Sequence, residues 1–215
     1  MKGVLFGEYH SYDNLNLILS EKDIGAPQVK THTIDVPGGD GELDFTEFFG
    51  EPKYGNVQHK FTFTTIRPQK EFLTQYSTVK NALHGKKARI VLDDDPTFFY
   101  MGRCEVSNFK NEKGIGTIVI TCDCEPYKYS LAKTVVYQAV DGVVDVKLLN
   151  SRKRAVPEVW IESEAGLNIV FDTSNIWDLG SGTYTLPELE LTEGENIVTV
   201  TGTGEISFTW QEGDL

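Results

Sequence analysis

Residues 115–124 read Ile-Gly-Thr-Ile-Val-Ile-Thr-Cys-Asp-Cys, and apolar side chains occupy every second position from Ile118 to Cys124. Successive side chains of a β-strand point to opposite faces of its sheet, so a period of two is typical of a strand with one buried face. The same period predicts a mainly β protein built from antiparallel sheets. It recurs at Leu15/Leu17/Leu19, Phe61/Phe63, Ile90/Leu92 and Phe98/Tyr100/Gly102/Cys104/Val106.

One segment, residues 68–85, departs from this period. Its apolar side chains recur at steps of four, three and four, which places them on one face of an α-helix. Pro68 suits the first turn of that helix, and Gly85 suits the position just after its end. We expect a single helix that covers an open side of the β structure and can also serve a subunit contact. The residues on its apolar face are Phe72, Tyr76, Val79 and Leu83.

An acidic stretch, Asp93-Asp94-Asp95-Pro96, separates two of the alternating runs. Proline and aspartate are turn formers, so the stretch predicts a hairpin turn. Three neighbouring carboxylates also suit calcium, but the spacing of an EF-hand loop and its distal glutamate are missing. The hairpin turn is therefore the favoured interpretation.

A second set of alternating pairs begins at about residue 134. Short strands separated by turn signals, with no helical period, predict a β-sandwich. Gly202-Thr203-Gly204 is interpreted as one of the turns, and Trp160 and Trp210 are interpreted as core residues. The apolar pairs are Val159/Ile161, Leu167/Ile169/Phe171, Leu189/Leu191, Val198/Val200 and Ile206/Phe208/Trp210.

The chain length of 215 residues fits one large domain or two small ones. We place a boundary where the first set of strands stops, which gives domains at 1–130 and 131–215. The two halves differ in charge, because residues 1–128 hold 15 lysines and arginines against 18 acids, whereas residues 129–215 hold 5 against 14. An acidic half repels phosphate backbones, so nucleic-acid binding is disfavoured.

Membrane and export signals are missing from the sequence. No apolar run approaches the length that spans a bilayer, and Glu8 interrupts any signal-peptide core. We expect a protein that is made and kept in a cytoplasm, or released from one without a signal. An odd number of cysteines suits a reducing compartment, and we interpret Cys104, Cys122 and Cys124 as small core or sheet residues.

Motifs that carry chemistry are also missing. The four histidines, at positions 10, 32, 59 and 84, have no acid or cysteine beside them at metal-ligand spacing. There is no nucleophile elbow, phosphate-binding glycine loop or zinc signature. A pair of acids could serve glycoside hydrolysis, but nothing selects a pair. We therefore expect no enzymatic activity, no cofactor and no metal.

Residues 36–50 combine turn formers with a burst of aromatic residues and show no strand or helix period. Gly38, Gly39 and Gly41 surround Asp40, so the backbone is expected to turn sharply there. A self-anchored loop would bury its phenylalanines in its own core, whereas a docking loop would present them to a neighbouring subunit. The candidate interface residues are Pro37, Gly38, Gly39, Asp40, Gly41, Phe45, Phe48 and Phe49.

Taken in order along the chain, several of these segments resemble the distal tail proteins of siphophages, a family often called Dit. The resemblance is most specific in the first half, and the ending Ile206–Leu215 is similar to the last strand of the family's second domain. The first-half segments are Val36–Asp44 followed by Tyr54, the helix end Ala82–Lys86, Ile90–Asp95 followed by Tyr100–Arg103, and Cys124–Lys128.

The resemblance implies a structural protein without catalytic residues. Its N-terminal domain would be a β-sandwich or split barrel with one helix that forms a ring, typically a hexamer. A galectin-like or carbohydrate-module-like β-sandwich would follow. The ring would join the tail tube protein to the tail-tip protein or tail-associated lysin, with the tape measure and receptor-binding proteins as further partners. The location implied is the distal end of the virion tail, after assembly in the bacterial cytoplasm.

An alternative is a carbohydrate-binding protein that acts through the second half. Trp177 lies between polar residues, in Thr173-Ser174-Asn175-Ile176-Trp177-Asp178, and is the best candidate for an exposed ligand contact. A loop aromatic that folds back onto its own sandwich is the competing interpretation. The third interpretation is a glycosidase that uses a pair of carboxylates.

Overall fold

The computed structural model describes residues 3–48, 50–112 and 114–215. The chain forms two compact units, the first reaching Lys128 and the second comprising Tyr129–Asp214. Both units are mainly β, and the described residues contain one α-helix, as the periodicity predicted. Among these residues, no helix is both long and apolar enough to cross a membrane.

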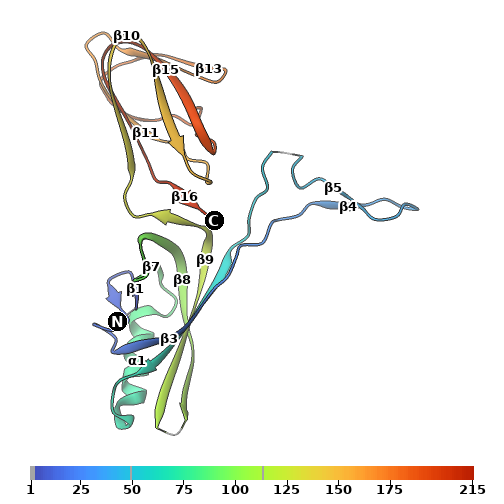
Figure 1. Ribbon diagram of the computed structural model, residues 1–215, viewed down its shortest axis with the longest axis vertical. Helices are drawn as coiled ribbons and strands as arrows, with labels where there is room; N and C mark the ends of the chain where they lie inside the picture. Colours follow the sequence, from blue (N-terminus) through green and yellow to red (C-terminus); the bar gives the residue numbers. More distant parts are fainter. Residues whose placement is uncertain (1–2, 49, 113) are drawn as a thin grey trace. The chain divides into compact units, whose positions relative to one another are not determined.

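The first unit contains a sheet of seven strands with one helix packed against it (Figure 1). The sheet order is β2-β1-β7-β8-β9-β6-β3, and β4 and β5 form a separate two-stranded sheet. The elements are β1 (Val4–Phe6), β2 (Tyr9–His10), β3 (Leu17–Ile24), β4 (Thr33–Asp35), β5 (Glu42–Asp44), β6 (Val57–Thr65), the 3-10 turn η1 (Gln69–Glu71), α1 (Phe72–Leu83), β7 (Lys87–Leu92), β8 (Asp95–Glu112) and β9 (Ile115–Ser130).

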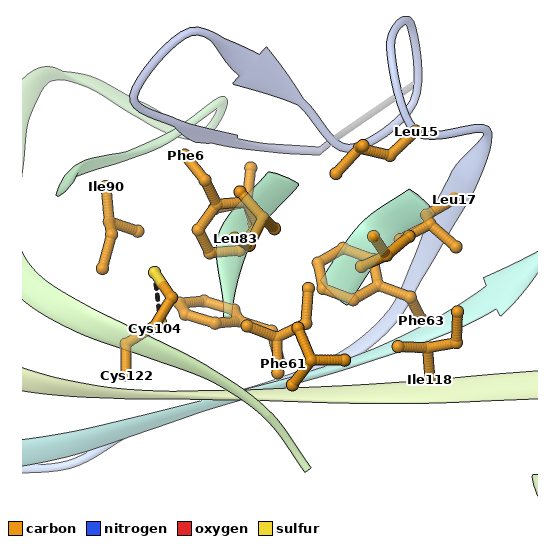
Figure 2. Close-up of a cluster of buried hydrophobic side chains, with 14 of the residues drawn as sticks. Phe6, Leu15, Leu17, Phe61, Phe63, Leu83, Ile90, Cys104, Ile118 and Cys122 are labelled. Carbon is orange, nitrogen blue, oxygen red and sulfur yellow. Dashed lines mark hydrogen bonds between the residues drawn. The ribbon is translucent and has the colours of Figure 1, made fainter. Parts of the chain in front are cut away.

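Helix α1 confirms the predicted helical segment and closes the core of the first unit. Val79 and Leu83 lie in one buried cluster with strands β1, β6 and β9 (Figure 2). Within that cluster the ring of Phe6 lies 5.7 Å from that of Phe61 and 6.1 Å from that of Phe63, both edge-on. Such pairs add to the burial of apolar area, so these rings carry much of the packing energy of the unit.

A buried amide ties the helix to the strands. The Gln75 side chain, only 8 % exposed, donates from Nε2 to the carbonyl oxygens of Leu15 (2.9 Å) and Asn16 (3.0 Å). Its Oε1 accepts a hydrogen bond from the Thr65 hydroxyl of β6. A buried polar group must be satisfied to be tolerated, and Gln75 meets this requirement by linking three segments. The apolar period gave no sign of this residue.

The acidic stretch forms the predicted hairpin turn between β7 and β8. Leu92 pairs with Asp95 at the base of that turn. Asp93 accepts a hydrogen bond from the Gly3 backbone N–H at 2.6 Å, and Asp94 forms an ion pair with Lys22 of β3. The acids therefore tie the hairpin turn to the residue before β1 and to β3 of the same unit.

All three cysteines are buried in the first core, as predicted. The Cys122 Sγ donates to the Cys104 Sγ at 3.3 Å, the contact drawn as a dashed line in Figure 2. Gly102 accompanies them because a Cβ at this position would overlap the Cys124 sulfur. The alternating row of residues in β8 therefore needs a glycine at position 102, because a larger residue there would collide with the Cys124 thiol.

The second unit is a single curled sheet around its own core (Figure 1). The sheet order is β13-β12-β15-β11-β14, and β10 pairs with β15 along its whole length, from Thr134↔Trp210 to Asn150↔Gly194. The elements are β10 (Thr134–Asn150), β11 (Glu158–Glu162), β12 (Leu167–Phe171), β13 (Ser174–Leu179), β14 (Gly182–Thr185), β15 (Gly194–Trp210) and β16 (Gly213–Asp214).

The predicted turn at Gly202-Thr203-Gly204 is wrong, because β15 runs through it without a break. Gly202 has φ +138° and Gly204 has φ +156°, conformations that side-chain-bearing residues rarely adopt. A Cβ on Gly204 would overlap the carbonyl oxygen of Glu162, and one on Gly202 would lie 2.7 Å from Leu167 Cδ2. The glycines therefore allow one long strand to bend from β12 to β11.

Two further expectations for the second half are corrected. Leu189 and Leu191 are buried, but they form no strand, and Leu191 makes only a single bridge to Ala155. Trp160 is not a core residue but is 37 % exposed, because Val159 and Ile161 on either side of it point inward. Trp210, in contrast, lies in the core as predicted.

Candidate functional site

Residues 25–56, here called the arm, connect β3 to β6 and extend away from the main sheet of the first unit (Figure 1). The two sides of the arm pair at its base through a Val29↔Tyr54 bridge and a Lys30 N–H bond to the Lys53 carbonyl of 2.7 Å. None of the described residues of the arm is buried. The arm therefore has no core of its own.

The far part of the arm is an amphipathic ribbon made by β4 and β5. Residues directly opposite each other in antiparallel strands share a face, so Ile34 and Leu43 lie together on one side of it. They are 58 % and 52 % exposed. The neighbouring pairs, Thr33↔Asp44 and Asp35↔Glu42, place only polar side chains on the other side.

The turn that joins β4 to β5 contains the predicted glycines. Gly38 and Gly41 have φ +82° and +78°, and the Gly39 N–H donates to the Val36 carbonyl at 3.0 Å. The sharp turn is thus confirmed, and Pro37, Gly38, Gly39, Asp40 and Gly41 are all exposed on it. Although residues 36–50 as a whole show no strand period, Glu42–Asp44 forms strand β5.

The segment after β5 is held by hydrogen bonds to the opposite side of the arm. The Phe45 N–H donates to the His32 carbonyl at 2.7 Å, and the His32 N–H donates to the Thr46 hydroxyl at 3.1 Å. Hydrogen bonds from the Thr46 side chain and backbone lower the pKa of the Asp44 carboxyl. This geometry fixes where the following aromatic residues emerge.

The phenylalanines of the arm differ in exposure. The Phe45 and Phe48 rings pack edge-on at 5.9 Å, with Phe45 half-buried and Phe48 70 % exposed. Phe49, the third candidate, lies outside the described residues. Phe48 and the ribbon pair Ile34 and Leu43 are therefore apolar groups that this chain leaves exposed to solvent.

Sequence reasoning missed Ile34 and Leu43 as candidate interface residues. Their signal was present in Thr33-Ile34-Asp35-Val36 and in Glu42-Leu43-Asp44, which alternate polar and apolar side chains. Each run is only three or four residues long, too short to establish a period, and the glycines between the two runs predict only a turn. The pattern identifies a face only once the two runs are known to pair.

The second unit carries the other candidate residue. Trp177 lies on β13, at one end of the sheet order, and is 66 % exposed. Its neighbour Asp178 donates its backbone N–H to the Asn168 Oδ1 at 2.8 Å, which ties this edge to β12. Among the described residues, no three His, Cys, Asp or Glu side chains are grouped so that they could hold a metal ion.

The fold and its exposed apolar arm define a mainly β protein of two units whose clearest surface feature suits assembly with other chains. No protein-family model and no curated protein matches the sequence. Among solved structures, the chain is similar to the crystal structure of the SPP1 Dit protein (gp 19.1), with a TM-score of 0.76 over 100 % of both chains at 12 % identity. That protein is described as a paradigm of the hub adsorption apparatus in phages that infect Gram-positive bacteria. The fold is therefore Dit-like.

Proposed function

We propose that this chain is a structural subunit of a phage tail hub. The supporting observation is the arm, whose ribbon presents Ile34 and Leu43 on one face, where the described residues leave both side chains more than half exposed. Exposed apolar side chains gathered on one projecting element are typical of a surface that is buried on association. The likeness to SPP1 Dit, which extends over the full chain, is the reason for proposing a tail hub as the assembly.

In this proposal the first domain, residues 1–130, forms a closed ring, and residues 131–215 form a second domain that does not take part in the ring contact. Every subunit of a ring uses two different faces, and the contact closes by rotation. The arm, with the turn Pro37–Gly41 and the phenylalanines Phe45, Phe48 and Phe49, provides one of the two faces. A homohexamer is the expected stoichiometry.

The ring would join the tail tube protein to the tail-tip protein or tail-associated lysin, at the distal end of the virion tail after assembly in the host cytoplasm. The tape measure and receptor-binding proteins are further candidate partners. The role is structural and involves no catalysis, cofactor or metal. The acidic second halves of neighbouring subunits would stay apart from one another, because like charges repel.

The test is the mass in solution and the appearance in electron micrographs of the purified protein, alone and mixed with the tail tube protein. We expect rings in at least the mixture. The double variant Ile34→Ser/Leu43→Ser, and separately Phe48→Ser, should abolish them. The matched control Asp35→Ser/Glu42→Ser changes the adjacent rung of the same ribbon on its polar face, and it should still assemble.

A monomer at high concentration that forms no ring beside the tube protein would refute the ring. Rings that survive all the apolar substitutions would show that assembly uses another surface, and the arm would then lose its assigned role.

A further inference from the structure

Two aromatic side chains share a row on the outer face of the second unit, away from its core. The register places Tyr137 of β10 opposite Ser207 of β15, and Ser207 opposite Trp160 of β11. Tyr137 is 55 % exposed and Trp160 is 37 % exposed. Because paired positions lie ~5 Å apart, the backbones of Tyr137 and Trp160 lie ~10 Å apart, with Ser207 at the position between them.

Carboxylates, hydroxyls and two small apolar side chains flank this pair of rings. One adjacent row contains Ala139, Glu205 and Glu162, and the row on the other side contains Val135, Thr209, Glu158 and Thr185. Thr183 extends the aromatic row itself. A hydrogen bond to the Glu205 carboxylate raises the pKa of the Tyr137 hydroxyl, so Tyr137 is bonded to its acidic neighbour.

The three glutamates beside the rings, Glu158, Glu162 and Glu205, differ from other acids of the same unit in their ion pairing. No lysine or arginine forms an ion pair with Glu158, Glu162 or Glu205 in the described part of the chain, whereas Glu190, Glu193 and Glu195 of the same unit are each paired. The row around the rings therefore carries net negative charge that a ligand could neutralise.

A shallow pocket of about 490 Å³ adjoins the row at Glu162. Ser163 and Ser181 fix its wall, since the Ser163 N–H donates to the Ser181 Oγ and the Ser181 hydroxyl donates to the Ser163 carbonyl, both at 3.0 Å. Glu164 and Thr203 also line it. The pocket therefore continues the same combination of hydroxyl and carboxylate groups beyond the rings.

We propose that this face of β10, β15 and β11 binds a glycan that carries free amino groups. Exposed aromatic rings offer flat apolar faces to sugar rings, and Trp160 and Tyr137 can also attract an ammonium through their π-systems. Unpaired carboxylates form strong charge-assisted hydrogen bonds with ammonium groups, and hydroxyls pair with sugar hydroxyls. A neutral sugar would leave the charge of the three glutamates uncompensated.

A protein partner fits this face less well. The buried centre of a protein–protein interface is depleted in glutamate, and here glutamates lie directly beside both rings. Anionic polymers are disfavoured by the same charge. The proposal is independent of the arm and of the hub assignment, because every residue in it lies in the second unit.

The experiment is calorimetric titration of the full chain with three hexasaccharides of matched linkage: a glucosamine oligomer, its N-acetylated counterpart and the unsubstituted glucose oligomer. We expect the glucosamine oligomer to bind at least tenfold more tightly than the other two. Trp160→Ala and Tyr137→Ala should each weaken that binding at least tenfold, and Trp160→Phe should restore part of it. Glu162→Gln/Glu205→Gln should weaken binding and reduce its salt dependence.

Trp177→Ala is the control, because it removes a tryptophan that is more exposed than Trp160 (66 % against 37 %) and lies on β13, at one end of the sheet order. Circular dichroism melts of every variant separate loss of binding from loss of fold. The proposal is overturned by no binding of the glucosamine oligomer, by equal binding of the N-acetylated oligomer, or by binding that Trp177→Ala abolishes and Trp160→Ala leaves intact. Loss of a tail-protein contact in Trp160→Ala without any glycan binding would identify a protein interface instead.

Discussion

Strand β6 and the arm that leads into it are adjacent in the sequence, yet they use the same period of two in opposite ways. β6 buries every second side chain from Val57 to Thr65, whereas no described residue of the arm is buried. Burial of apolar area stabilises the first unit through β6, and the same kind of area on the arm remains available for association. The comparison shows that alternation predicts a strand but not what covers its apolar face.

The largest difference between the two regions should appear when a phenylalanine is removed from each. Phe61→Ala in β6 is expected to destabilise the first unit by about 3–5 kcal/mol, because it leaves a cavity in a packed core. Phe48→Ala in the arm is expected to change the free energy of unfolding by no more than about 0.5 kcal/mol. Urea denaturation of the two variants measures both values, and equal losses would mean that the arm is packed in solution.

A smaller loss is expected from the buried amide of α1. Gln75→Leu leaves the carbonyls of Leu15 and Asn16 without their donor, so it should cost about 1–3 kcal/mol. The matched control is Gln28→Leu, in the exposed arm, which should be close to neutral. A neutral Gln75→Leu would show that the amide does not hold the helix against the sheet.

His59 makes the stability of β6 depend on pH. Its ring is buried and packs against Tyr100, neither of its nitrogens has a partner among the described residues, and burial lowers its pKa against a weaker opposing effect of Asp23. The unfolded chain binds the proton near pH 6.5, whereas the folded chain binds it only at lower pH. The contribution of His59 to the free energy of unfolding is therefore fully present above pH 6.5. It is lost as the pH falls below that value, by at most about 1.4 kcal/mol per pH unit.

The measurement for His59 is the urea midpoint between pH 5 and pH 8. His59→Phe should flatten the acid side of that profile, and His32→Phe, on the exposed arm, should leave the slope as in the parent chain. A profile in His59→Phe that is as steep as the parent's would assign the acid sensitivity to other groups.

The smallest effect on stability is expected from the apolar face of the ribbon. Ile34→Ser/Leu43→Ser should shift the unfolding free energy by no more than about 0.5 kcal/mol per substitution, since both side chains are already more than half exposed. The same double variant should have the largest effect on ring assembly. A large loss of stability in the isolated subunit would contradict the exposed placement of this face.

Much of the fold could be predicted because the period of apolar residues and the positions of glycines depend on the local conformation of the backbone. The helix at Phe72–Leu83, the turn after Leu92 and the positive φ of Gly38 each follow from a few neighbouring residues. The continuous strand β15 could not, because Gly202 and Gly204 give the same signal in a bend as in a turn, and only the nearness of Leu167 and Glu162 distinguishes the two.

The candidate sites were harder to predict from the sequence, because they depend on which strands pair. Trp160 alternates with Val159 and Ile161, so its outward direction was available, but its neighbour Tyr137 lies far away in the sequence. Likewise, Ile34 and Leu43 become one surface only through the β4–β5 register. Composition indicated the acidic half, and only the structure located unpaired acids beside two rings.

The long strand β15 also sets the order in which the chain can fold during synthesis. β15 is hydrogen-bonded to β10, β11 and β12, so the sheet of the second unit lacks its central member until residues 194–210 have been made. The pairs among the seven strands of the first unit's sheet, β1–β3 and β6–β9, are complete once β9 has been synthesised. The first unit, including its exposed arm, can therefore fold on the ribosome before the second unit is complete. Strand β10 cannot pair until β15, which lies some sixty residues later in the sequence, has been synthesised.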